Sequence, residues 1–91
     1  MRVVWTTPAT QDLLRIFRRV QHDNPVAATR VTDELFDGCA KLANFPNRGR
    51  RGRMNATQEL VFPGLPYIVV YQIELEVVRV LRIYHGAQDW P

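Results

Sequence analysis

The spacing of apolar residues changes once along this 91-residue chain, and this change limits what the chain can fold into. Up to residue 43 the apolar residues recur every three or four positions, which is typical of one face of an α-helix. From residue 57 onward they alternate or run continuously, which is typical of β-strands. A chain of this length has room for one modest core, which both halves must share. The sequence therefore predicts an α+β fold and a single domain over residues 1–91.

Two start signals that contain proline predict a helical hairpin. We expect the first helix to begin with Thr7 as its N-cap and Pro8 at its first position, and to end near His22. Asn24 and the proline after it repeat the signal for a second helix, which runs to about Ala43. Because the link between the helices is short, they should lie antiparallel with their apolar faces on a common partner.

That partner is a sheet made from both ends of the chain. A β-branched run over 2–5 precedes the first helix, and three more strands are expected over 57–62, 67–73 and 77–85. The segment 67–73 is nearly all apolar and should be a central strand. The predicted order is β-α-α-β-β-β, with the helical hairpin packed on one face of a mainly antiparallel sheet. Regular alternation in the last strand would place four side chains on one face and His85 on the other, the four being Val78, Val80, Arg82 and Tyr84.

A cluster of arginines separates the helical half from the β half. The segment 46–53 lacks an apolar anchor apart from its proline and should be an exposed loop, with positive charge from Arg48, Arg50, Arg51 and Arg53. Guanidinium groups bind phosphate oxygens in a forked geometry, so the loop could bind nucleic acid. An acidic surface on a partner protein and simple solubility are the other interpretations.

A second group of polar residues could support RNA cleavage, which needs a base, an acid and a cation. His85 or Glu59 could exchange protons, Arg82 could stabilise charge, and Tyr84 lies beside them in sequence. The structural interpretation is that His85 is a hydrogen-bonded turn residue before a glycine. The face assignment of the last strand also separates His85 from the other two residues of that strand.

Other classes of protein are disfavoured by composition. Cys39 is the single cysteine and there are two histidines, so neither an internal disulfide nor a metal site is expected, and no cofactor is indicated. The longest apolar run, 65–71, is far shorter than the ~20 residues of a membrane helix. No leader is recognised at the N-terminus, so a cytoplasmic protein is expected.

Ordered sequence pieces along the whole chain resemble the RelE/ParE superfamily of toxins from bacterial type II toxin–antitoxin modules. These pieces are Thr7-Pro8-Ala9 with Asp12-Leu13, Asn24-Pro25 with Ala27-Ala28, Leu42 with Phe45-Pro46, Gly49-Arg50, Glu59-Leu60-Val61, Tyr67-Ile68-Val69-Val70-Tyr71 and the C-terminal motif from Arg82 to Asp89. The resemblance implies a toxin that promotes plasmid stabilisation and is neutralised by a cognate antitoxin in a hetero-oligomeric complex. The superfamily's β-α-α-β-β-β order agrees with the order derived above.

The resemblance leaves the target open between two branches. The RelE branch cleaves mRNA on the ribosome with basic residues, but here Ile68 occupies the place of an arginine in the central strand. Gly86, Ala87 and Gln88 likewise replace a basic run after the last strand. The ParE branch inhibits DNA gyrase without a known nuclease site. The sequence therefore favours a ParE-like gyrase inhibitor, with the arginine segment as the binding surface and no catalysis. The alternatives are a ribosome-dependent mRNA endonuclease and a relative that only binds its antitoxin.

Overall fold

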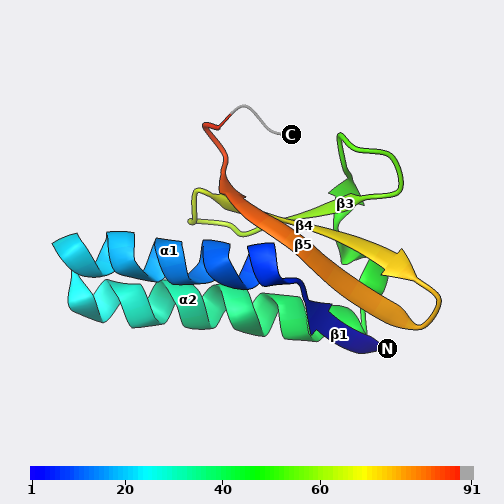
Figure 1. Ribbon diagram of the computed structural model, residues 1–91, viewed down its shortest axis with the longest axis horizontal. Coiled ribbons are helices and arrows are strands. Elements are labelled where there is room, and N and C mark those ends of the chain that lie inside the picture. Colours follow the sequence, from blue (N-terminus) through cyan, green and yellow to red (C-terminus); the bar gives the residue numbers. More distant parts are fainter. Residues whose placement is uncertain (89–91) are drawn as a thin grey trace.

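Two helices lie side by side against one face of a five-stranded sheet in the computed structural model, which describes residues 1–88 (Figure 1). The spatial order of the strands is β1-β5-β4-β3-β2. Their bounds are β1 Arg2–Trp5, β2 Arg50–Arg51, β3 Gln58–Val61, β4 Tyr67–Glu74 and β5 Val77–His85. The first strand pairs parallel to β5 and the other pairings are antiparallel. The predicted α+β class is thus confirmed, with β4 central, and Asp89 of the family motif lies outside the described residues.

The hairpin consists of α1 (Thr7–Asp23) and α2 (Pro25–Ala40). Thr6, not the predicted Thr7, is the N-cap of α1, because its backbone is extended and its side-chain oxygen accepts from the amide of Ala9 at 3.2 Å. Asn24 caps α2 as predicted, and its side chain accepts from the amide of Ala27 at 3.1 Å. A 3₁₀ turn over Lys41–Ala43 continues α2 to the predicted end.

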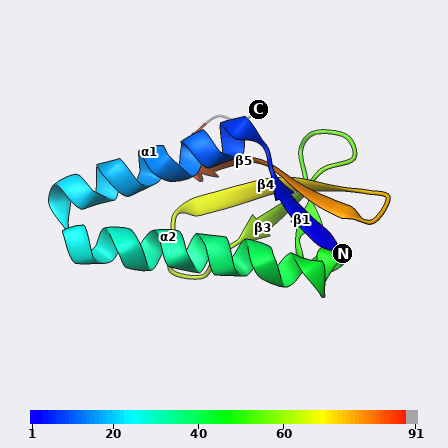
Figure 2. The same cartoon turned by 60° about the horizontal axis from the view of Figure 1, so that its bottom comes forward.

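The core fills the space between the hairpin and the sheet (Figure 2). The inner face of β4 supplies alternate residues to this core, and α1 and α2 supply their apolar stripes. The buried members include Ala9, Ile16, Leu35, Cys39, Leu42, Tyr67, Val69, Tyr71, Val78, Val80 and Ile83. The turn between the helices projects beyond the sheet in Figure 1, so its residues contribute little to this core.

A β-bulge in β5 reverses the alternation of its side chains. Arg82 pairs with Val70, whereas the next pair along β4 joins Tyr71 to Val80, so Leu81 is an extra residue. Ile83 therefore joins Val78 and Val80 on the face toward the helices. The prediction that Arg82 and Tyr84 share a face with Val78 and Val80 is wrong for this reason. The separation of His85 from Arg82 and Tyr84 holds, because all three lie after the bulge.

The arginine segment is more ordered than the predicted loop. Pro46–Arg48 forms a 3₁₀ turn, and Arg50–Arg51 forms β2 along the edge of β3. Tyr71, fully buried in the core, fixes this turn with its hydroxyl, which accepts from the amide of Gly49 at 2.8 Å and donates to the carbonyl of Pro46 at 2.7 Å. A Cβ at position 49 would lie 2.6 Å from that hydroxyl, so glycine allows the approach.

Cys39 is an apolar core residue in this fold, as the helical stripe predicted. Burial raises the pKa of its thiol to about 12, so the thiolate needed for metal binding or nucleophilic attack is scarce at neutral pH. Within residues 1–88, no three His, Cys, Asp or Glu side chains are grouped as a metal site. No helix in that range is long and apolar enough to cross a membrane.

Candidate functional site

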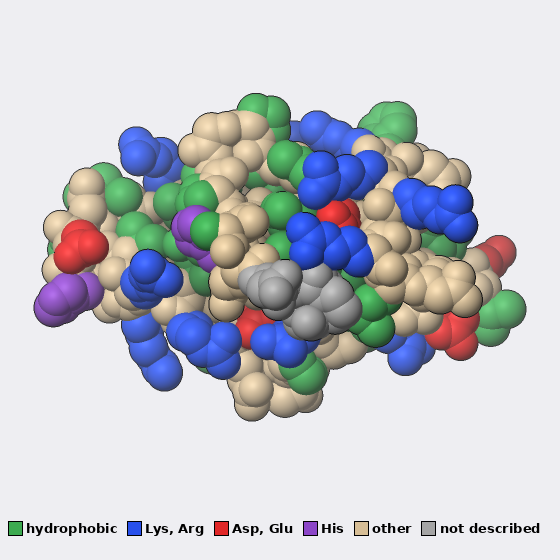
Figure 3. Space-filling model, turned by 90° about the horizontal axis from the view of Figure 1, so that it is seen from above, with side chains coloured by type: hydrophobic (Ala, Val, Ile, Leu, Met, Phe, Trp, Pro, Cys, Tyr) green, Lys and Arg blue, Asp and Glu red, His purple; other side chains and the backbone are tan. Residues whose placement is uncertain are grey.

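A row of polar side chains crosses the face of the sheet that points away from the helices. The strand registers place Arg50 beside Glu59, Glu59 beside Val70, and Val70 beside Arg82. Tyr84 lies one step along the same face of β5. Figure 3 shows a side of the molecule where Lys and Arg side chains (blue) are spread around a few carboxylates (red). The sheet thus brings together Arg50 of the arginine segment and three of the four candidate catalytic residues.

Glu59 is a buried carboxylate that holds the arginine segment in place. It is only 3% exposed and accepts from Nε and Nη2 of Arg50 at 3.2 and 3.1 Å. The backbone amide of Arg53 donates to its other oxygen at 3.3 Å. Removal of one partner from a buried ion pair is strongly destabilising, so the contact between Glu59 and Arg50 contributes to the order of the arginine segment.

Tyr84 is buried close to this carboxylate. Burial and then the negative charge of Glu59 raise the pKa of the Tyr84 hydroxyl, although Arg53 and Arg50 oppose the shift. The hydroxyl therefore stays protonated at neutral pH. A raised pKa is the opposite of what a phenolate base requires, so Tyr84 is suited to donating a hydrogen bond.

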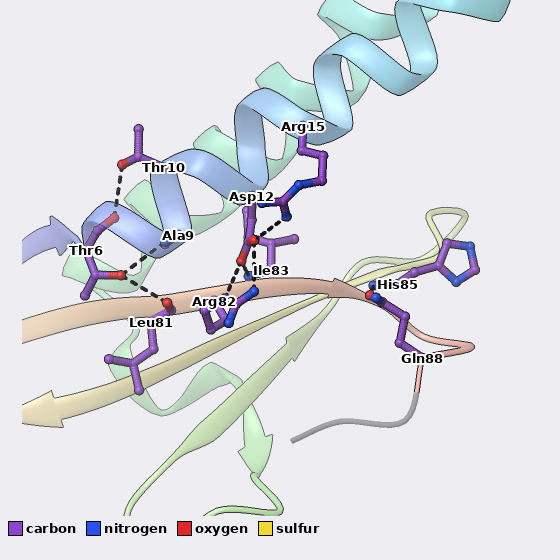
Figure 4. A network of polar contacts seen from close by, with 10 residues as sticks. All are labelled: Thr6, Ala9, Thr10, Asp12, Arg15, Leu81, Arg82, Ile83, His85 and Gln88. Carbon is purple, nitrogen blue, oxygen red and sulfur yellow. Dashed lines mark hydrogen bonds and ion pairs between the residues drawn. The ribbon is translucent and has the colours of Figure 1, made fainter.

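Arg82 pairs with Asp12 across the interface between α1 and β5 (Figure 4). Asp12 is 2% exposed and accepts from Nε and Nη2 of Arg82 at 2.7 and 3.1 Å. It also accepts from the amide of Ile83 at 2.9 Å and from Nη1 of Arg15 at 2.8 Å. Burial opposes ionisation of Asp12, but these hydrogen bonds outweigh it and hold the pKa of the carboxyl below its usual range. Asp12 in turn raises the pKa of Arg82, which stays charged.

His85, at the end of β5, makes hydrogen bonds with the residues that follow it. Its Nδ1 accepts from the amide of Ala87 at 3.0 Å, and its own amide donates to Oε1 of Gln88 at 2.7 Å. The ring also makes an edge contact with Tyr67, with centroids 5.7 Å apart. In Figure 4 the imidazole lies away from the Asp12–Arg82 pair. His85, the last residue of β5, is thus held by hydrogen bonds to the turn that follows it, and the fold does not bring it to Glu59.

The four arginines of the segment are all exposed but face different surroundings. Arg50 binds Glu59, whereas Arg51 and Arg53 border the hollow inside the loop from 51 to 58. Arg48 borders a separate groove along α2. The segment therefore presents positive charge over a wide surface rather than in one pocket.

A groove of about 960 Å³ runs between α2 and the edge of β3. The short β2 pairs only with Gln58 and Glu59, so among residues 1–88 no strand lies beside the rest of β3 on that side. Leu60 and Phe62 line the groove, together with Val61, which is 47% exposed. An open strand edge beside apolar side chains favours a bound peptide segment.

Asp12 is the residue of this region whose role the sequence analysis missed. The sequence did indicate a buried carboxylate, because Asp12 falls between Ala9 and Ile16 on the buried stripe of α1. A carboxylate at such a position needs a buried partner. Its partner Arg82 is 70 residues away in sequence, so spacing could not identify it.

Comparisons with known proteins agree with this geometry. A sequence model of the family described as "ParE toxin of type II toxin-antitoxin system, parDE" matches residues 3–90. The protein Y4kP of Sinorhizobium fredii is 38% identical over 99% of this chain and 93% of its own length. Toxin RelE2 of Caulobacter vibrioides is 33% identical over 96% of this chain and 97% of its own length.

A solved structure shares the fold. A chain of the chromosomal ParDE toxin–antitoxin system from P. aeruginosa superposes with a TM-score of 0.87 at 20% identity, over 93% of this chain and 95% of that one. This likeness confirms the arrangement of two helices on a five-stranded mixed sheet. Since the family match spans nearly the whole chain, this protein belongs to the ParE family of toxins from type II toxin–antitoxin systems.

Proposed function

We propose that this chain is a cytoplasmic toxin that inhibits DNA gyrase by binding to gyrase or a gyrase–DNA intermediate, and that it makes or breaks no covalent bond itself. It acts within a module for plasmid stabilisation and is neutralised by a cognate antitoxin. The family to which the chain belongs supports the toxin role. The choice of gyrase rests on the state of the residues that a nuclease would use.

The observation that carries the proposal is that three of the four candidate catalytic side chains, Glu59, Arg82 and His85, make hydrogen bonds or ion pairs within the fold. Glu59 and Arg82 are held in intramolecular ion pairs, with Arg50 and Asp12. The ring of His85 accepts a backbone hydrogen bond, and the pKa of Tyr84 is raised. A general acid–base pair needs each group within hydrogen-bond reach of the atom whose proton it transfers, here the attacking and the leaving oxygen on either side of one phosphate. Glu59 lies beside Val70 and His85 lies beside Tyr67, on opposite faces of the sheet, so their positions do not favour action on one phosphate.

The proposed contact surface is the arginine segment, with Arg48, Arg50, Arg51 and Arg53. Its backbone is held by pairing with β3 and by the hydroxyl of Tyr71. A segment whose backbone is already ordered loses little further backbone entropy on binding, and its guanidinium groups suit an anionic surface. DNA phosphates within a gyrase–DNA complex and acidic residues of gyrase both meet this requirement.

The antitoxin is proposed to occupy the groove between α2 and the edge of β3. Among the solved relatives are toxin–antitoxin complexes, including the ParDE system of P. aeruginosa. A segment of antitoxin in extended conformation would pair with the uncovered part of β3 and cover Val61. Toxin and antitoxin would then form a hetero-oligomer.

The alternative function is that of a ribosome-dependent mRNA endonuclease. The relative named RelE2 favours it, as does the gathering of Glu59, Tyr84 and Arg82 on one face of the sheet. In that case Arg82 would stabilise the developing phosphate charge and His85 would serve in proton transfer. Both would have to leave their present hydrogen bonds in the complex with the ribosome.

A paired assay on antitoxin-free protein distinguishes the two functions. Gyrase supercoiling of plasmid DNA and cleavage of mRNA on programmed ribosomes are measured with the same preparation. Gyrase inhibition with intact mRNA supports the proposal, whereas cleavage with normal supercoiling establishes the alternative. In the gyrase assay, Arg51→Gln should weaken inhibition while Arg18→Gln, an equal change of charge on α1, should not.

Nuclease variants give an independent check. His85→Ala and Arg82→Ala should both abolish toxicity if the chain cleaves RNA, since loss of a transition-state cation or proton donor slows such a step by orders of magnitude. Under the proposed function His85→Ala retains toxicity. Thermal melting of each variant shows whether a loss of toxicity reflects unfolding.

A further inference from the structure

A second cavity, of about 340 Å³, lies where α1 meets the end of β5, and the proposed function makes no use of it. Arg15 and Arg19 reach it from α1, one helical turn apart. His85 and Gln88 line the other side. Polar side chains from α1, from β5 and from the turn after β5 thus line the same cavity.

The carboxylate of Asp12, the ring of His85 and the side-chain oxygen of Gln88 already accept hydrogen bonds within the protein. Asp12 accepts four hydrogen bonds, two on each carboxylate oxygen, which fills the capacity of a carboxylate. Nδ1 of His85 accepts from the amide of Ala87, and Oε1 of Gln88 accepts from the amide of His85. A ligand that needs acceptors would find few here.

The donors, in contrast, remain available. Arg15 uses one of its guanidinium nitrogens on Asp12, and Arg19 makes no ion pair within residues 1–88. Because Nδ1 of His85 is an acceptor, the proton of the neutral ring is on Nε2, which can donate. The amide nitrogen of Gln88 is a further donor, since its oxygen is the atom engaged. The cavity therefore suits a ligand made of acceptors.

The charge of the cavity indicates which class of anion it would bind. The described residues that line the cavity include one carboxylate, Asp12, and two guanidinium groups, Arg15 and Arg19, which give a net charge of +1. Arg82 does not line the cavity but pairs with Asp12, and its charge raises the local balance to +2. A phosphate group carries about −1.5 to −2 at pH 7 and three acceptor oxygens, whereas a carboxylate carries one charge on two oxygens. We propose that this cavity binds a phosphate group.

Titration with inorganic phosphate tests the proposal. The full chain is titrated at constant ionic strength, with amide shifts in NMR spectra as the readout. Saturable shifts at His85, Ala87 and the helix around Arg19 are expected. Arg19→Gln should weaken phosphate binding by about tenfold or more, as expected for a charged hydrogen bond. Arg18→Gln is the matched control, because Arg18 does not line the cavity and its replacement removes the same charge from the same helix.

Three results would overturn the proposal: no saturable binding of phosphate, equal weakening by Arg18→Gln and Arg19→Gln, or acetate binding as tightly as phosphate. A melting curve that matches the wild type shows that Arg19→Gln is folded. Competition by trinucleotides identifies the source of the phosphate. Displacement only by a 5′-phosphorylated trinucleotide indicates a terminal phosphate, and displacement also by the 5′-hydroxyl form indicates a phosphodiester.

Discussion

At the scale of single residues, Asp12 connects the helical hairpin to the last strand. Its carboxylate binds a guanidinium and a backbone amide of β5, and an arginine of its own helix. Removal of one partner from such a buried ion pair is strongly destabilising, because it leaves the other charge buried without a partner. The intact pair, in contrast, is often no more stabilising than apolar side chains of the same size. The position of α1 over β5 therefore depends on the charge of this one side chain.

Asp12→Asn should lower the free energy of unfolding by about 2–3 kcal/mol at pH 7, because charged hydrogen bonds are replaced by weaker ones. The pKa of Asp12 lies below its ordinary value in the folded protein, so its contribution is complete above pH ~4 and declines as pH falls through the folded-state pKa. Urea denaturation at several pH values measures both effects. The variant should lose less stability than the wild type between pH 4 and pH 2.

Asp33→Asn is the control for this prediction, since Asp33 is an exposed carboxylate on α2. It should change stability by less than about 0.5 kcal/mol. Equal effects of the two substitutions, or an acid dependence unchanged by Asp12→Asn, would show that the pairing with Arg82 is not what stabilises the interface.

At the scale of elements, the contact of α2 with the sheet depends on Gly38. A Cβ at this position would lie 2.2 Å from Cε2 of Phe62, far inside van der Waals contact. The ring of Phe62 occupies the space that a side chain at position 38 would need. Gly38 and Phe62 both line the groove, so a larger residue at position 38 would displace the ring there.

Gly38→Ala should destabilise the fold by about 1–3 kcal/mol, despite the higher helix propensity of alanine, because the ring of Phe62 must move. Phe62→Leu removes the clashing atoms and should recover part of the loss in the double variant. Chemical denaturation of both single variants and the double variant gives the interaction energy. Additive effects would contradict the contact.

The arginine segment depends in the same way on Tyr71. Tyr71→Phe removes the hydroxyl that binds both Gly49 and Pro46 and should lower the free energy of unfolding by about 1–3 kcal/mol, since the half-buried amide of Gly49 loses its partner. Hydrogen exchange of the Gly49 amide should accelerate. Protection of that amide at the wild-type level would show that the turn is held by β2 alone.

Local signals explain which elements the sequence predicts. The caps and Pro residues at 8 and 25 act within a few residues, so both helices are predicted to within about three residues at each end. The short β2 was missed, because its two residues become a strand only by pairing with β3. The bulge at Leu81 and the pairing of Asp12 with Arg82 likewise depend on contacts between distant segments. The sequence thus identified candidate residues by their chemical type, but it could not predict the hydrogen bonds and ion pairs that these residues make in the fold.

At the scale of the whole molecule, the groove along α2 predicts that the free toxin is less stable than its complex. A ligand that binds only the folded chain stabilises it by about 4 kcal/mol at a concentration of 1,000 Kd. The melting temperature should therefore rise when saturating antitoxin is added. Identical melting temperatures for free toxin and saturated complex would exclude this linkage.

A substitution in the groove tests whether the antitoxin binds there. Val61→Asp places a charge in the groove and should weaken antitoxin binding by about tenfold or more through the loss of apolar burial. Leu75→Asp is the matched control, since Leu75 is 91% exposed in the turn between β4 and β5 and does not line the groove. Isothermal titration calorimetry with both variants separates this surface from a general effect of charge.

The strand order has a consequence for how the chain is made. Since β5 lies between β1 and β4, the sheet consists of two unconnected parts until β5 is synthesised. The strand β1 pairs with residues about 75 positions later in the sequence. Pairings over such distances form slowly. A chain without β5 therefore lacks a complete sheet, because only β5 joins β1 to the other three strands.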